Sequence, residues 1–292
     1  YRIHSQSATG SRRGGEWAAH RPWLIAMRDM LLRRGELEPY YAPLLNSFVL
    51  RLYKDGGIGG VMREFNGKVK PELAQAKASE AIAGGVITTN ADNAQMHAAE
   101  NRTTLIYNDW GDHRVGADIL CYMTGYNDPR VEKMFLPNDV GDYVGIRIGI
   151  DVAGKSTAMT KYSNLIVEST TPYLWFNAAE ATFLRAEYEL RWGSEETAQA
   201  LYEDAIRLSF EERGASGADA YITDAASRPA AYTDPLGNYS AAAQSTITIA
   251  WAPGADNFEE NLERIITQKW IAIFPLGVEA WSEHRRTGYP RL

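Results

Sequence analysis

The stretch from Gln268 to Pro290 reads QKWIAIFPLGVEAWSEHRRTGYP and is the most specific segment of this chain. A helix is predicted to lead into this segment. Apolar residues recur there every three to four positions, at Leu262, Ile265, Ile266, Trp270 and Ile273. We expect this helix to begin at Asp256, with Glu259 completing a capping box. Phe274-Pro275 predicts its end, since proline lacks a donor and disfavours helical geometry just before itself.

A second short helix is expected after this proline. Val278 and Trp281 lie three residues apart, which is the spacing of one helical face, so we expect Trp281, like Trp270, to pack in the core. The charges of Arg285 and Arg286 are expected to pair with nearby carboxylates such as Glu279 and Glu283, or with one elsewhere. The segment thus predicts structure rather than a ligand site.

Two adjacent amphipathic helices are predicted further upstream. Thr171-Pro172 offers an N-cap and a first-turn proline for a helix to Leu190, and Gly193 ends it. Ser194 caps the next helix, whose apolar stripe contains Ala198, Leu201, Tyr202, Ala205 and Ile206. Small residues and one aromatic at this spacing match the second helix of a tetratricopeptide repeat.

The rest of the chain predicts one more clear helix and three long polar loops. The helix is Ala-rich and runs from Pro71 to Ile82, before Gly84-Gly85. The loops are residues 107–114, 138–161 and 214–252, and Ser245 to Trp251 reads as a short strand in the last one. We therefore predict a mostly α single domain over residues 1–292, with tetratricopeptide-like helical hairpins (an α-α superhelix) and a loop-rich ligand-binding face.

The composition narrows the class of protein. Its 292 residues are 45% hydrophobic, enough for a substantial core, and the net charge is −7 without a clustered basic stripe. This balance argues against nucleic acid as a partner. Cys121 is the only cysteine and lies in an apolar run, so we expect a buried, inert thiol. No run of 18 apolar residues predicts a transmembrane helix.

Three segments in the right order resemble the SusD/RagB-like family, the surface nutrient-binding lipoproteins of Bacteroidetes. The first consists of residues 46–52 followed, after an insertion-like stretch, by residues 70–96, which contain AGGVITTNADNA at residues 83–94. The second is GYNDPR at residues 125–130, and the third combines the helix of residues 172–190 with residues 268–290. The resemblance covers the chain from Asn46 onward. The glycine-rich residues 54–66 and the first forty residues, including a Met-Leu-rich helix predicted from Leu24 to Leu32, depart from it.

The resemblance implies a function and a location. It implies a non-catalytic protein at the outer-membrane surface, held by a lipid anchor upstream of this chain. It also implies binding of an oligosaccharide, or of a peptide, for delivery to a SusC-like TonB-dependent transporter. Family members are typically much longer, so by resemblance we expect an N-terminal portion to be missing here.

The loop of residues 107–114 is the candidate binding site. Carbohydrates are recognised by flat aromatic faces together with amides, carboxylates and arginine that bond their polar edges. The loop supplies all of these types within eight residues, and the candidates are Tyr107, Asn108, Asp109, Trp110, Asp112 and Arg114. Trp251, Tyr232 and Tyr239 are weaker candidates from the long third loop.

Two other classes of function stay open from the residues alone. An enzyme would have to rest on carboxylates such as Asp109 with Asp112, or Glu180 with Glu187, because no metal-ligating histidine pair, nucleophile motif or phosphate-binding loop occurs. Residues 90–93 resemble a calcium loop but lack its glycine and distal glutamate, so no metal or cofactor is predicted. A helical-repeat scaffold for protein partners is the other alternative.

Overall fold

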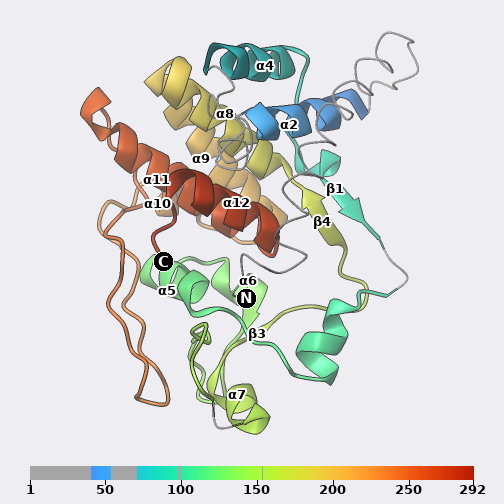
Figure 1. Ribbon diagram of the computed structural model, residues 1–292, viewed down its shortest axis with the longest axis vertical. Coiled ribbons are helices and arrows are strands. Elements are labelled where there is room, and N and C mark those ends of the chain that lie inside the picture. Colours follow the sequence, from blue (N-terminus) through green and yellow to red (C-terminus); the bar gives the residue numbers. More distant parts are fainter. Residues whose placement is uncertain (1–40, 54–70, 98–99, 153) are drawn as a thin grey trace, which may run out of the picture.

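The computed structural model describes residues 41–53, 71–97, 100–152 and 154–292. The helix predicted from Leu24 to Leu32 and the glycine-rich residues 54–66 lie outside the described residues. The described part is mostly helical (Figure 1). Its long helices gather at one end of the molecule and its loops at the other, where the short helix α7 lies.

The helical end is built from six elements, which are α2 (Tyr41–Tyr53), α4 (Pro71–Ala83), α8 (Ala178–Trp192), α9 (Glu195–Glu212), α11 (Phe258–Ala272) and α12 (Gly277–Thr287). The loop end carries shorter ones, which are η2 (Leu105–Asp109), α5 (Ala117–Gly125), α6 (Val131–Met134), β2 (Phe135–Leu136), α7 (Lys155–Lys161) and β3 (Asn164–Leu165), while the short α10 (Ala218–Ile222) lies against α9 at the helical end. A ribbon of β1 (Ala94–Met96) and β4 (Tyr173–Phe176) lies at the side of the molecule (Figure 1).

The predicted helical hairpin is α8 with α9. Ser194 caps α9 as predicted, because its side chain accepts from the N–H of Thr197. Buried alanines on both helices allow close approach, and the ring of Phe183 lies 6.1 Å from that of Tyr202 between them. The prediction that α8 begins at Pro172 is wrong. Residues 173–176 pair with β1 instead, and Asn177 caps the helix by accepting from the N–H of Glu180.

The TTNADNA turn after α4 docks onto the α8–α9 hairpin. Asn90 donates to the carbonyl of Leu208, and Asn93 donates to Glu212 while accepting from the N–H of Ala178. These amides, which gave the segment its likeness to a calcium loop, are therefore used to fasten it to helices. Among the described residues no cluster of three metal-ligating side chains exists.

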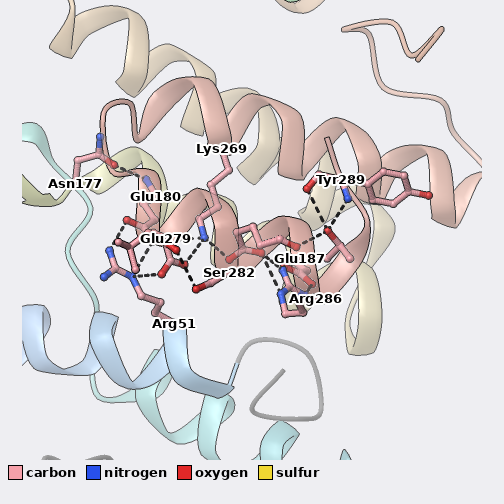
Figure 2. A network of polar contacts seen from close by, with 12 residues as sticks. Arg51, Asn177, Glu180, Glu187, Lys269, Glu279, Ser282, Arg286 and Tyr289 are labelled. Atoms are coloured by element: carbon pink, nitrogen blue, oxygen red, sulfur yellow. Dashed lines mark hydrogen bonds and ion pairs between the residues drawn. The ribbon is translucent and has the colours of Figure 1, made fainter. Parts of the chain in front are cut away.

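The helix α12 is polar on the side that faces the protein. Glu279, Glu283 and Arg286 share one helical face and meet charges from α2, α8 and α11 (Figure 2). Val278 and Trp281 consequently lie on the outer face, with exposed fractions of 80% and 56%. The prediction that Trp281 packs in the core is wrong, because the ion pairs decide which face turns inward.

These charges form what we call the ionic clasp, defined as Arg51, Glu180, Glu187, Lys269, Glu283 and Arg286. The Lys269 ammonium lies 2.6 Å from Glu283 and 3.4 Å from Glu180. Arg286 bonds both oxygens of Glu187 at 2.6 and 2.7 Å, a bidentate pair, and also contacts Glu283. The expected pairing of Arg286 is thus confirmed.

Three further local predictions are revised. The helix α11 begins at Phe258 rather than at the predicted Asp256. Its N-cap residue, Asn257, forms no side-chain cap bond, so the predicted capping box is absent. Residues 245–251 have no strand partner among the described strands, and buried tyrosine hydroxyls donate to the carbonyls of Ile247 and Ile249 instead. Cys121 is only half-buried, but burial and nearby Asp118 raise the pKa of its thiol to about 11.

The Asp-Pro-Arg motif ties the loop end to the helical end. Arg130 is fully buried and bonds Asp128 at 2.6 Å, Ser209 of α9 at 2.8 Å and Gln268 of α11 at 3.0 Å. Its guanidinium also lies over the ring of Phe210. A single buried arginine thus joins the loops below to two helices above.

Candidate functional site

The candidate loop begins in a short π-helix, η2 (Leu105–Asp109). Its last turn is closed by the N–H of Trp110, which donates to the carbonyl of Leu105 at 2.6 Å. Gly111 follows with φ of +62°, a conformation that favours glycine, and the N–H of Asp112 returns to the carbonyl of Ile106. The backbone is therefore held while the side chain of Trp110 projects from the turn.

Trp110 is exposed over 55% of its surface and has an apolar neighbour. A Cβ placed on Gly111 would lie 3.1 Å from the sulfur of Met159, so α7 packs directly on the loop at this glycine. Met159 is itself 46% exposed. Trp110 and Met159 are thus exposed apolar side chains on two segments that pack together at Gly111, and we call the two residues the Trp110 platform.

Exposed carboxylates lie on both sides of Trp110 in the loop. Asp112 forms an ion pair of 2.8 Å with Lys155 at the first residue of α7. Both partners are half-exposed, so the pair is solvent-screened and contributes at most about 1 kcal/mol. Asp109 is exposed at the end of η2, beside Trp110. Carboxylates thus stand next to an aromatic face, as recognition of hydroxyl groups requires.

An amide pair joins the loop to strand β3. The side chain of Asn108 donates to the carbonyl of Val167 at 3.0 Å and accepts from the amide of Asn164 at 3.3 Å. The same amide of Asn164 donates to the carbonyl of Tyr107. Asn108 therefore supports the loop and still exposes part of its surface.

Tyr107 and Arg114 face the protein more than the solvent. The ring of Tyr107 packs against the main core, and burial raises the pKa of its hydroxyl. The guanidinium of Arg114 donates to the carbonyls of Tyr107 and His113, and burial lowers its pKa. Of the six predicted site residues, these two brace the loop, while Asn108, Asp109, Trp110 and Asp112 are exposed.

The other candidates from the sequence lie elsewhere. Trp251 packs its ring 5.5 Å from that of Tyr202, and Tyr232 is buried. Tyr239 offers its backbone carbonyl to Arg147. The carboxylates of Glu180 and Glu187 are buried in the ionic clasp, where both are paired with cations.

Sequence reasoning missed Met159, Lys155 and Asn164 as neighbours of the candidate loop. Each lies more than forty positions after Trp110, in a segment with only polar or short helical patterning. No local signal could have found them, because their contacts depend on how α7 and β3 return to the loop.

The family of the chain follows from comparison with known proteins. The sequence profile of the SusD-like family, described as SusD and RagB outer membrane lipoprotein, matches residues 62–292. The chain therefore belongs to the SusD-like family. No curated protein sequence matches it.

Solved structures of SusD homologues share this fold. One from Bacteroides thetaiotaomicron is 48% identical, with a TM-score of 0.79 over 87% of this chain and 52% of its own. A chitin-binding SusD homologue from Flavobacterium johnsoniae is 36% identical, with a TM-score of 0.81 over 97% of this chain and 61% of its own. The predicted mostly helical, tetratricopeptide-like fold is confirmed.

The lengths of these relatives differ from that of this chain. The chain spans about half the length of the first SusD homologues that it matches, as with a Bacteroides uniformis homologue of which it covers 53%. Within the described residues, no helix is long and apolar enough to cross a membrane.

Proposed function

We propose that this protein binds a nutrient oligosaccharide at the cell surface, without a covalent step, and delivers it to a SusC-like TonB-dependent transporter in the outer membrane. Trp110 is the stacking surface for a sugar ring in this proposal. Asn108, Asp109 and Asp112 bond the hydroxyl groups at the ring edge, and Tyr107 and Arg114 hold the loop in shape.

The exposed Trp110 beside Met159 carries the proposal. A large aromatic ring that is more than half exposed leaves apolar surface in water, and stacking against the apolar face of a sugar removes that surface from water. The neighbouring carboxylates accept hydrogen bonds from hydroxyl groups, which fixes the orientation of the sugar. Neither the platform nor its rim supplies a buried nucleophile or an unpaired buried acid.

Two comparisons support a carbohydrate as the ligand. The family is one of outer-membrane lipoproteins, and one of its members with a closely similar structure is chitin-binding. Chitin is a neutral polymer of sugar rings, a ligand suited to an aromatic platform with a polar rim. An oligosaccharide therefore fits both the family and the exposed residues.

Isothermal titration calorimetry against chitohexaose, cellohexaose and maltohexaose tests the proposal, with a set of uncharged hexapeptides as the alternative ligands. We expect one hexasaccharide to bind, and Trp110→Ala to weaken its binding by about 30-fold, or about 2 kcal/mol. Trp281→Ala is the matched control, because Trp281 is equally exposed on α12 and should leave the affinity unchanged. Absence of binding to all three hexasaccharides, or equal loss in both variants, would overturn the proposal.

A further inference from the structure

A hollow of about 520 Å³ lies beside α7, apart from the residues of the candidate loop. Its volume falls within the range of about 300–1,000 Å³ that is usual for small-molecule sites. Its walls come from three segments, namely residues 138–144, the last two residues of α7 and residues 233–235. We call it the α7 hollow.

The first wall is fixed by Asn138. Its side-chain oxygen accepts from the N–H groups of Val140 and Asp142, and its amide donates to the carbonyl of Lys161. The N–H of Asp139 donates to the carbonyl of Thr160, which ties the same turn to α7. The Asn138 side chain and backbone bonds therefore hold this turn, and the side chains of Asp139 and Asp142 are not used for it.

The second wall is fixed by Asp234. Its carboxylate accepts from the hydroxyl of Tyr162, one residue after α7, and from the N–H groups of Asn238 and Tyr239. Both Tyr162 and Asp234 are buried. The turn that contains Thr233 and Pro235 is therefore held next to α7 by hydrogen bonds, as the first wall is.

The charged side chains that line the hollow have no partner of their own. Asp139, Asp142 and Lys161 are exposed, and none of them forms a side-chain hydrogen bond or ion pair with another described residue. Two carboxylates and one ammonium group together accept and donate hydrogen bonds, as neighbouring hydroxyls of a sugar ring require. The excess of one negative charge disfavours an acidic ligand.

The α7 hollow adjoins the Trp110 platform through a single helical turn. Met159 contacts the loop at Gly111, and the next two residues, Thr160 and Lys161, line the hollow. Because both sites use consecutive residues of α7, we infer a separation on the order of the width of a helix, about 10–12 Å. A short oligosaccharide crosses such a span, whereas a single sugar ring does not.

We propose that the α7 hollow is a second subsite, which holds the sugar units of a neutral or amine-bearing oligosaccharide beyond the unit stacked on Trp110. This inference rests on the proposed function, since it requires a sugar at Trp110. Asp139 and Asp142 accept from the hydroxyls of the distal units, and Lys161 donates to them. The protein consequently selects for chain length and against uronic acids.

Titrations with a hexasaccharide and a disaccharide of the same sugar test the inference, using whichever of chitohexaose, cellohexaose and maltohexaose the wild type binds. The variant combines Asp142→Asn with Lys161→Gln, changes that remove both charges and leave the backbone bonds of the wall in place. We expect hexasaccharide affinity to fall about tenfold or more and disaccharide affinity to stay the same. Asp256→Asn, a carboxylate that lines neither site, is the control and should change nothing.

The outcomes separate this inference from the proposed function. If Trp110→Ala abolishes binding while the double variant keeps full hexasaccharide affinity, the hollow is not a subsite and the proposed function stands. If the wild type binds no hexasaccharide, both fall together. A hexamer of galacturonic acid is expected to bind at least tenfold more weakly than the neutral hexamer, and equal binding would overturn the charge preference.

Discussion

The ionic clasp and the Trp110 platform use the same residue types in opposite ways. In the clasp, charges lie inside and Val278 and Trp281 lie outside, and every cation has a carboxylate partner. Around the platform, the backbone is satisfied internally, while Trp110 and several charged groups face water. Exposure of an aromatic ring alone therefore does not mark a ligand site in this protein. What distinguishes Trp110 is the set of exposed polar side chains beside it in the loop, which are Asn108, Asp109 and Asp112.

Burial also sets the energetic weight of the two regions. Lys269, Glu180 and Glu283 are almost fully removed from solvent, so each charge depends on the others. The pair of Asp112 with Lys155 is half-exposed and screened. The clasp should therefore control stability, and the loop end should control binding.

Breaking the clasp should have the largest effect. Lys269→Met removes the ammonium group that buried Glu180 and Glu283 share and leaves each of them with one arginine, and we expect the free energy of unfolding to fall by about 3–5 kcal/mol. Urea denaturation measures this loss, and calorimetry on the folded variant should show unchanged oligosaccharide affinity. Lys155→Met is the matched control, with a loss of at most about 1 kcal/mol. Equal losses in the two variants would show that the clasp is not the stabilising region.

Removing the charge of Asp234 tests the support of the loop end. Burial raises the pKa of this carboxyl group, but hydrogen bonds from the N–H groups of Asn238 and Leu236 outweigh it, so the pKa lies below the ordinary 3.8. The stabilisation is therefore present above pH 3.8 and is lost as the pH falls through the folded-state pKa.

For Asp234→Asn we expect a loss of about 1–3 kcal/mol in unfolding free energy at pH 7. The gap between wild type and variant should close as the pH drops below 3.8, which urea titrations at several pH values would reveal. A gap that stays constant down to pH 2.5 would contradict this account. Asp256→Asn serves as the control, because Asp256 is exposed and should leave stability unchanged at every pH.

Substitution of Gly111 tests whether the contact with α7 positions Trp110, and we expect its effect to be the smallest of these changes. Gly111 and Gly214 share φ of +62°, but only at Gly111 would a Cβ meet Met159, while at Gly214 it would meet nothing within 4 Å. We expect either substitution to alanine to cost about 1–2 kcal/mol of stability through backbone strain. Gly111→Ala should weaken oligosaccharide binding severalfold, whereas Gly214→Ala should leave it unchanged. Equal binding by both single variants would show that contact with α7 does not position Trp110.

Much of the helical end follows from the sequence because its signals are local. The cap at Ser194, the stripe of α9 and the stop before Pro275 each depend on residues within a few turns, so they are found as predicted. The structure of residues 173–176 was not predicted correctly, because Pro172 is typical of a helix start and these residues form a strand. Its strand depends on pairing with β1, which lies about eighty positions earlier.

The candidate site divides in the same way. The loop of residues 107–114 could be singled out from its composition, and the structure places Asn108, Asp109, Trp110 and Asp112 at its surface. The sequence alone could not identify Met159 and Lys155 as neighbours of this loop. It also could not identify the α7 hollow, because the walls of the hollow come from three separate segments. The role of these residues in binding stays a prediction.

The stretch from Gln268 to Pro290 shows where the boundary lies. By itself the sequence determined that a helix ends near Pro275 and that a second helix follows, because periodicity and proline act within one turn. Only the tertiary structure decided which face of that second helix is buried. Lys269, Arg51 and Glu187 present charges to it, and a buried charge must be paired, so Glu283 and Arg286 turn inward and Trp281 turns to solvent.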